Sequence, residues 1–119
     1  MQQGGSIQLN PEMQHCIQLC QDCETTCQLT LMYCLRQGGT YAEAAHIRLL
    51  LDCLVLCQTC TGLMARDSEF AGRYCTLCAD LCDRCAASCE QFAGDAQLTA
   101  CAQSCRRCAE SCRAMGTAA

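Results

Sequence analysis

Lysine is absent from this sequence, and proline occurs once in 119 residues. The basic residues are eight arginines, and the net charge of −4 leaves no basic surface for nucleic acid. No apolar run reaches the roughly 18 residues that a membrane-spanning helix requires. The first ten residues contain neither a basic nor an apolar segment, so no export signal is expected. These absences favour a cytoplasmic protein of one domain that binds neither nucleic acid nor membranes.

Cysteine, by contrast, occupies 17 positions, a fraction that is typical of disulfide scaffolds in short secreted chains. The odd number prevents complete pairing within one chain. Cysteines three or four apart on one helix have Cβ atoms about 5–6 Å apart, against roughly 3.8 Å in a disulfide. Small disulfide-rich domains also consist largely of loops, whereas this chain has long periodic segments. We therefore expect reduced thiols.

Turn and capping residues divide the chain into four helical segments. Asn10 and Pro11 suit an N-cap and a first helical residue. The other boundaries are indicated by Gly38 with Gly39, by a capping-box pattern of Thr40 with Glu43, by Asp67 or Ser68, by Gly94 with Asp95, and by Gly116. We expect helices over residues 11–37, 40–66, 68–93 and 95–115, between a flexible segment at 1–10 and a tail at 116–119. Because the connections are short, the expected fold is an all-α, up-down-up-down antiparallel four-helix bundle.

Within every expected helix the cysteines are three, four or seven residues apart, which is the spacing of core-facing positions in a bundle. They are Cys16, Cys20, Cys23, Cys27 and Cys34 in the first helix, Cys53, Cys57 and Cys60 in the second, Cys75, Cys78, Cys82, Cys85 and Cys89 in the third, and Cys101, Cys105, Cys108 and Cys112 in the fourth. The sequence therefore predicts a bundle whose core is lined with cysteine.

Antiparallel stacking of these helices groups the cysteines into layers. The predicted layers are Cys16, Cys60, Cys75 with Cys112; Cys20, Cys57, Cys78 with Cys108; Cys23, Cys53, Cys82 with Cys105; and Cys27, Cys85, Cys101 with Leu50. The same register places Met13, Met64 and Met115 together at one end. At the other end it places His46 beside Cys89, with Cys34 and Phe92 beyond them. The three tyrosines are expected at the surface or at helix ends.

So many thiols in register point to metal binding. Leucine would fill a core better than cysteine and would not oxidise. With two histidines in the chain, no repeated pair of a cysteine and an activating base is present, so an enzyme is not expected. The compact cysteine run of a ferredoxin, followed by proline, is also absent. Thiolates select soft or borderline ions such as Cu(I), Zn(II) and cadmium.

Charge favours copper over zinc as the bound ion. Four thiolates around Zn(II) leave a net negative charge, and burying several such sites would cost several kcal/mol for each charge. Cu(I) with bridging thiolates, at about one ion for each sulfur, is neutral. Successive core layers lie about 5 Å apart, close to the span of two metal–sulfur bonds of roughly 2.3 Å each. A zinc or cadmium thiolate buffer stays open as one alternative, and a redox-active thiol reservoir as another.

The stretches CTLCADLCDRCAASC, beginning at Cys75, and CAQSCRRCAESC, beginning at Cys101, repeat C-x₃-C and C-x₂-C steps that occur on all four expected helices. From about Pro11 to Met115 the chain resembles the four-helix-bundle copper storage proteins, in the form without an export signal. The resemblance implies Cu(I) held by nearly all core cysteines, a homotetramer, and metal that enters through an end lined by methionine or histidine. The residues that match this lining are Met13, Met64 and Met115, with His15 close by, while His46 matches it less well.

The sequence thus predicts a cytosolic Cu(I) storage or detoxification protein, with about one copper for each cysteine and copper chaperones as candidate partners. The candidate ligands are the 17 cysteines together with Met13, Met64, Met115, His46 and His15. Patterning alone should form the helices, so the thiols are expected to be in place before metal binds. The second helix is apolar nearly all round, at Leu49, Leu51, Leu54 and Leu56, and we expect association with other copies through it.

Overall fold

The computed structural model describes residues 9–118, so residues 1–8 of the expected flexible segment and residue 119 of the expected tail lie outside the described residues. Within the described part the chain forms four α-helices and no strand. They are α1 (Pro11–Gln37), α2 (Ala44–Ala65), α3 (Ala71–Glu90) and α4 (Ala96–Ala118), with a short 3₁₀ helix, η1 (Gly39–Ala42), between the first two. The all-α fold class predicted from the sequence is confirmed.

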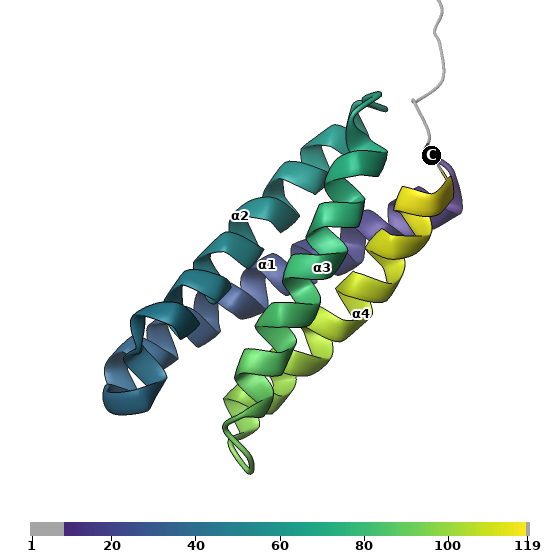
Figure 1. Ribbon diagram of the computed structural model, residues 1–119. Coiled ribbons are helices and arrows are strands. Elements are labelled where there is room, and N and C mark those ends of the chain that lie inside the picture. Colours follow the sequence, from purple (N-terminus) through teal and green to yellow (C-terminus); the bar gives the residue numbers. More distant parts are fainter. Residues whose placement is uncertain (1–8, 119) are drawn as a thin grey trace, which may run out of the picture.

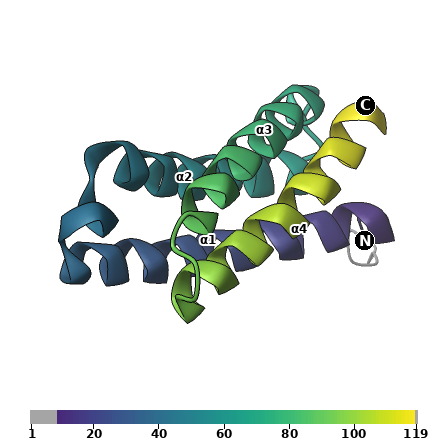
Figure 2. The same ribbon diagram turned by 60° about the horizontal axis from the view of Figure 1, so that its bottom comes forward.

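Consecutive helices run antiparallel and lie beside one another (Figure 1). The α1–α2 and α3–α4 connections lie at one end of the bundle, and the α2–α3 connection lies at the other, near the end of α4. After rotation of the view the same two pairs remain, α1 with α2 and α3 with α4 (Figure 2). The up-down-up-down topology predicted from the short connections is therefore confirmed.

Two of the predicted helix starts are confirmed by their hydrogen bonds. The Asn10 side chain accepts a bond from the backbone N–H of Met13 at 2.8 Å, with Pro11 as the first helical residue. Asp95 accepts a bond from the N–H of Leu98 at 3.1 Å and so caps α4. The end of α1 also agrees with the prediction, because Gly38 adopts φ 70° and its N–H bonds to the carbonyl of Cys34.

The capping box expected at Thr40 and Glu43 is wrong. A second glycine, Gly39, also has a positive φ of 56°, and the chain continues into η1 instead of starting a helix at residue 40. Helix α2 consequently begins at Ala44, with Glu43 as an N-cap that makes no side-chain capping bond. It ends at Ala65, one residue before the predicted end.

The expected start of the third helix at Asp67 or Ser68 is also wrong. Asp67 adopts φ 52°, and the Ser68 hydroxyl accepts a bond from the N–H of Phe70 within the turn, so α3 begins only at Ala71. At its other end α3 stops at Glu90 instead of residue 93, because residues 91–94 turn into α4. Ser68 is a good capping residue, but the α2–α3 turn uses its hydroxyl for a hydrogen bond of its own.

Gly116 does not end the fourth helix, which continues to Ala118. The prediction of a tail that begins at residue 116 is therefore wrong. The glycine serves a different purpose. A Cβ atom at this position would collide with Thr76 Oγ1 of α3 and lie 3.2 Å from the carbonyl of Gly72. Gly116 therefore lets α4 approach α3 closely.

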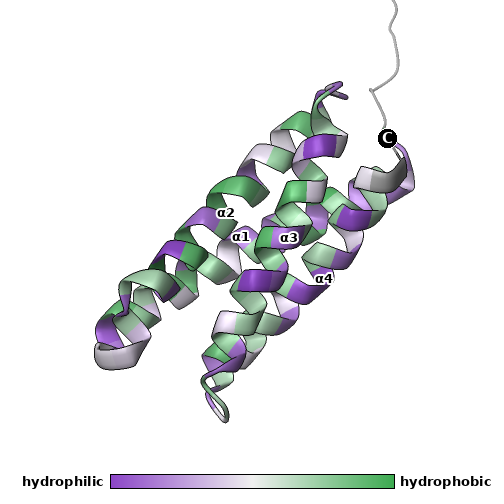
Figure 3. Ribbon diagram, in the orientation of Figure 1, coloured by the Kyte–Doolittle hydropathy of each residue, from purple (hydrophilic) through white to green (hydrophobic). Residues whose placement is uncertain are grey.

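The core contains every cysteine of the chain, each at most 1% exposed, together with larger apolar side chains such as Leu50, Leu98 and Met64. Hydrophilic segments recur along the ribbon of α4, whereas α2 has longer hydrophobic stretches (Figure 3). Among the described helices, α2 is the one that is long and apolar enough to cross a membrane by length and composition. It also contributes Cys53, Cys57 and other residues to the shared core, so its apolar character follows in part from its place in the bundle.

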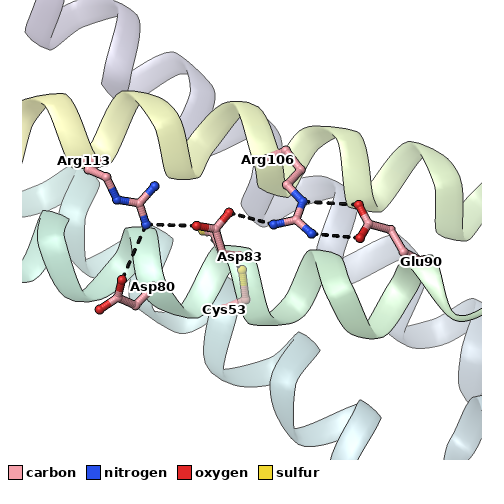
Figure 4. A network of polar contacts seen from close by, with 7 residues as sticks. Cys53, Asp80, Asp83, Glu90, Arg106 and Arg113 are labelled. Carbon is pink, nitrogen blue, oxygen red and sulfur yellow. Dashed lines mark hydrogen bonds and ion pairs between the residues drawn. The ribbon is translucent and has the colours of Figure 1, made fainter.

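Helices α3 and α4 are joined at the surface by a chain of ion pairs (Figure 4). The Arg106 guanidinium contacts Asp83 at 3.0 Å and Glu90 at 2.8 Å. Arg113 contacts the other oxygen of Asp83 at 2.9 Å and reaches Asp80 at 3.5 Å. Asp83 is thus shared by two arginines, half-way along the seam between the two helices.

Candidate metal centre

The thiols converge on the bundle axis because the cysteines occupy the core-facing positions of all four helices. The layer predicted from Cys20, Cys57, Cys78 and Cys108 is assembled as expected: Cys57 Sγ lies 3.8 Å from the sulfurs of Cys78 and Cys108, and Cys108 lies 3.7 Å from Cys20. These distances confirm that layer of the predicted register.

The next layer shows the same arrangement. Cys23 Sγ lies 3.9 Å from Cys53 and 3.7 Å from Cys105, and Cys53 lies 3.6 Å from Cys82. In the flanking layers, Cys16 Sγ lies 3.8 Å from Cys112 Sγ, and Cys27 Sγ lies 3.8 Å from Cys101 Sγ. The core is therefore built from sulfur layers, as the three- and four-residue spacing predicts.

Sulfur contacts also connect one layer to the next. Cys20 Sγ lies 3.5 Å from Cys112, and Cys78 lies 3.8 Å from Cys82 on the same helix. The described residues contain three sets of four cysteines and one set of three whose sulfurs all lie within 4.8 Å of one another. The sets are Cys23, Cys53, Cys57 with Cys82; Cys23, Cys27, Cys53 with Cys105; Cys57, Cys78, Cys82 with Cys108; and Cys16, Cys20 with Cys112. Because the first three sets share members, the sulfurs form a continuous array and not isolated sites.

The spacing of this array suits a metal ion with few ligands. Two metal–sulfur bonds of roughly 2.3 Å each join sulfurs up to about 4.6 Å apart, which exceeds the thiol contacts of 3.5 to 4.0 Å by about 1 Å or less. An ion between two thiolates therefore needs only small side-chain movements. A tetrahedral ion would need four sulfurs around each centre, and shared sulfurs limit how many such centres the array can hold.

Thiol contacts and burial determine which protons leave most easily. Hydrogen bonds from Cys105 and Cys108 lower the pKa of the Cys23 thiol. Contacts with Cys108 and Cys20, together with burial, raise the pKa of the Cys57 thiol. Some thiolates are thus stabilised by neighbours that remain protonated. A metal ion that binds to these sulfurs takes the place of the protons on them. Metal binding to the array must therefore release protons.

The methionines lie at the end of the bundle that contains the α2–α3 turn. Met64 is 1% exposed, whereas Met13 and Met115 are half-buried. All three line a cavity of about 430 Å³ together with Cys75, and three carboxylates, of Glu12, Asp67 and Glu69, also border it. The cavity thus joins the surface to the first sulfur layer through thioethers. The structure brings these three methionines together as the sequence predicts.

His15 is exposed and does not face the sulfur core. It borders a separate groove of about 370 Å³ between α1 and α4, with Glu12, Glu110 and Met115 among its lining residues. Met115 therefore lies between the histidine and the methionine cavity. His15 is two residues past the core-facing stripe, which accounts for its sideways position.

His46 lies at the opposite end of the bundle and is 6% exposed. Its Nε2 atom is 3.4 Å from Cys34 Sγ, and its Nδ1 atom is 2.6 Å from the Ser88 hydroxyl. Burial lowers the pKa of the His46 imidazole and raises the pKa of the Cys34 thiol to about 11. The sequence pattern identifies His46 as core-facing but gives no indication of Ser88, which comes from a different helix.

Aromatic side chains close this end. Phe92 stacks on Tyr41 with ring centroids 4.4 Å apart and lies 5.0 Å from the His46 ring. The hydroxyls of Tyr33 and Tyr41 both donate to Asp95, at 2.7 and 2.9 Å. The two tyrosines are half-buried at helix ends, in agreement with the prediction, but their shared carboxylate partner was not anticipated.

Comparison with known proteins identifies a matching family and a cysteine-rich relative. A model of the copper storage protein family matches residues 9–117. The chain is 36% identical over 74 residues to the cysteine-rich protein YhjQ of Bacillus subtilis, a match that covers 62% of this chain and 68% of that protein.

Three solved structures are similar over most of their length. A protein from Nitrosospira multiformis has a TM-score of 0.87 and 41% identity, covering 93% of this chain and all of its own. The Cu(I)-bound copper storage protein BsCsp3 has a TM-score of 0.83 and 33% identity, with coverages of 88% and 98%. The apo form of copper storage protein 3 from Bacillus subtilis has a TM-score of 0.80 and 34% identity, with coverages of 87% and 97%.

Proposed function

The chain belongs to the copper storage protein family, and we propose that it stores Cu(I) inside the bundle at about one ion for each of its 17 cysteines. One observation carries this proposal above the others. Every cysteine is buried, and most of their sulfurs form an array with contacts of 3.5 to 4.0 Å that run across and between layers. The similar Cu(I)-bound BsCsp3 structure supports copper as the ion.

Storage by this array is a metal–proton exchange without electron transfer. Each copper replaces a thiol proton, which leaves to solvent, and the resulting thiolate bridges to the next ion. A core filled at one Cu(I) for each thiolate is electrically neutral, so burial costs little. Zinc in the same core would leave uncompensated thiolate charge, and that favours Cu(I) over the zinc or cadmium alternative. We assign the ligand role to all 17 cysteines on this basis.

Copper is proposed to enter at the methionine end. The thioethers of Met13, Met64 and Met115 offer soft ligands between the surface and Cys75, and they can pass a Cu(I) ion inward without a change of charge. The carboxylates around the cavity attract cations to it. His15, in the adjoining groove, is placed to receive copper before Met115 does.

Association with other copies is proposed to involve the outer faces of α1 and α2. Leu51 and Val55 of α2 are about half exposed, and Leu29 of α1 is 61% exposed. Exposed apolar side chains of this size on neighbouring helices are typical of a contact surface. The homotetramer is inferred from the family resemblance, with this apolar face as the surface that such an assembly would bury.

The copper storage family supports a storage role, and we propose that the chain is not an enzyme. We further propose a cytoplasmic location, where thiols stay reduced, and copper chaperones as the donors or acceptors of the ion. The net charge of −4 supports the absence of nucleic acid from its partners. We propose no membrane partner, because the buried face of α2 is part of the sulfur core.

The test is an anaerobic titration of the reduced protein with Cu(I) in the presence of bathocuproine disulfonate as a competing chelator. We expect saturation near 17 ions for each chain and release of about one proton for each ion. Saturation at only a few ions would overturn storage, and a zinc titration would then decide between a metal buffer and a thiol reservoir.

A layer variant makes the titration specific. Replacing Cys20, Cys57, Cys78 and Cys108 by serine should lower the capacity by about four ions, because serine hydroxyls do not ligate Cu(I) well. Circular dichroism of the metal-free protein checks that the bundle exists before loading. A random coil in the absence of copper would contradict a preformed core.

A further inference from the structure

Cys34 differs from every other cysteine in its nearest polar partner. The others each contact at least one thiol, including Cys60 and Cys89 near the two ends. The partner of Cys34 is a nitrogen, His46 Nε2, at 3.4 Å. Seven residues, or about 10.5 Å along α1, separate Cys34 from Cys27, the preceding cysteine of that helix. No four-sulfur or three-sulfur set in the described residues includes Cys34.

His46 is held in the orientation that a metal ligand requires. Its Nδ1 atom lies 2.6 Å from the Ser88 hydroxyl of α3, which fixes the ring and leaves Nε2 directed at the Cys34 sulfur. Histidines that bind metals commonly use their second nitrogen for such an orienting hydrogen bond. Contact with the Phe92 ring, at 5.0 Å between centroids, restricts the imidazole further.

The buried surroundings of Cys34 and His46 favour a monovalent ion. Cys34 is fully buried, and Leu50 and Leu98 in the neighbouring core are fully buried as well. One thiolate and one neutral imidazole neutralise a monovalent cation, whereas a divalent ion would leave a buried positive charge. Sulfur together with imidazole nitrogen is a donor set that Cu(I) accepts.

We propose that Cys34 and His46 form a mononuclear Cu(I) site, separate from the thiolate-bridged array, with Ser88 as its positioning residue. This inference rests on the proposed storage function and adds a second kind of site to it. In the exchange, the Cys34 S–H bond breaks, a sulfur–copper bond forms, and the proton leaves to solvent with no electron transferred. The Nε2 lone pair of His46 completes the coordination.

This site lies near the surface at the end away from the methionines. His46 and Ser88 border a cavity of about 440 Å³ that also includes Glu43, Arg84 and Gln91. A chelator in solution therefore meets this copper through the His46 side, whereas ions in the array are surrounded by other sulfurs. We expect the Cys34–His46 copper to be lost in a step separate from the loss of copper from the array.

The direct test is nitrogen NMR of protein labelled with ¹⁵N-histidine and loaded with Cu(I). The chain has two histidines, and the resonances of His46 are identified by their loss in a His46→Leu variant. We expect the Nε2 resonance of His46 to shift at saturation and its Nδ1 resonance to move less. Complete removal of the copper by bathocuproine disulfonate should restore the free position.

Two matched variants separate ligation from packing. Cys34→Ser should abolish the His46 shift and remove one copper equivalent, whereas Cys60→Ser, at the opposite end, should preserve the shift. Ser88→Ala should retain the shift but make the ion leave faster. Circular dichroism confirms that each variant is folded.

The outcomes also distinguish this site from storage itself. An unshifted His46 in a protein that saturates near 17 ions overturns the mixed site and leaves storage intact. Saturation at a few ions together with a shifted His46 resonance would overturn storage and leave the Cys34–His46 site intact. A shift that persists in Cys34→Ser would overturn the assignment of Cys34 as the partner ligand.

Discussion

The two ends of this bundle are built from the same helices but are closed by opposite chemistry. At one end, thioethers of Met13, Met64 and Met115 line a cavity that reaches Cys75. At the other, Phe92 and Tyr41 stack, and two phenols donate to one carboxylate. Thioethers pack without needing hydrogen-bond partners and ligate soft ions, whereas the aromatic end depends on directional bonds that fix its parts. The thioether end therefore suits the proposed entry of copper, whereas the aromatic end holds the helices together.

The largest effect on stability is expected when the aromatic ring at the centre of the closed end is removed. Phe92→Ala should lower the free energy of unfolding by about 2 kcal/mol, because a half-buried ring loses its contacts with Tyr41 and His46. Urea denaturation of the reduced, metal-free protein measures this loss. The control is Phe70→Ala near the methionine end, where the ring is 48% exposed and the cost should stay within about 0.5 kcal/mol. Equal losses of stability in Phe92→Ala and Phe70→Ala would contradict the difference between the two ends.

The second prediction concerns the methionine end. Replacing Met13, Met64 and Met115 together by leucine should slow copper loading roughly tenfold, which corresponds to about 1.4 kcal/mol in the barrier. The capacity at equilibrium should remain unchanged, because leucine preserves the volume and the cysteines are untouched. Stopped-flow mixing with a Cu(I)–chelator complex gives the rate. Met32→Leu, an exposed methionine on α1, serves as the control and should load normally. A lower capacity with an unchanged rate would contradict the assignment of this end as the point of admission.

How much of this contrast is predictable from sequence depends on how far apart the partners are along the chain. The methionine layer and the sulfur layers follow from residues three and four apart, because one face of each helix must be buried. The bond between Tyr33 and Asp95 joins residues 62 positions apart, and no local pattern encodes it. The same is true of His46 and Ser88, which belong to different helices.

Helix boundaries show a related limit. Asn10 and Asp95 cap helices as predicted, since each side chain bonds to a backbone N–H three residues on. Ser68 has the same capacity but uses it inside a turn. Gly116 is a close-approach residue against Thr76 and not a stop, which becomes evident only when α3 lies beside α4. Local chemistry therefore identifies candidate caps, and tertiary packing decides which of them are used.

A third prediction tests the carboxylate that joins the phenols at the closed end. Hydrogen bonds from Tyr33 lower the pKa of Asp95, and Asp95 in turn raises the pKa of Tyr33 to about 12. A lowered carboxyl pKa stabilises the fold above the unfolded value near 4, and this contribution disappears as pH falls through the folded pKa. A raised phenol pKa stabilises the fold below the unfolded value near 10, and this is lost as pH rises through the folded value.

A double Tyr33→Phe and Tyr41→Phe variant should therefore lose a few degrees in Tm at neutral pH, with much of the difference from the unmodified protein vanishing in strong acid and strong alkali. Thermal unfolding followed by circular dichroism across that pH range measures it. Tyr74→Phe, an exposed tyrosine on α3, is the matched control. A difference that does not depend on pH would mean that the rings, and not the hydroxyls, support the closed end.

The smallest effect is expected between the two ends, along the surface seam of α3 and α4. Arg106 joins Asp83 and Glu90, but its side chain is 45% exposed, so solvent screens the pairs. Arg106→Gln should lower the free energy of unfolding by about 0.5 kcal/mol at low salt and by less at 1 M salt. The neighbouring exposed Arg107→Gln provides the control.

Burial works to raise the pKa of Asp83, while hydrogen bonds from Arg113 and Arg106 outweigh it and lower that pKa. The contribution should accordingly be present above about pH 4 and decline as the carboxylate is protonated in acid. A loss as large as that of Phe92→Ala would place the main support of the bundle on this seam and remove the distinction between its ends.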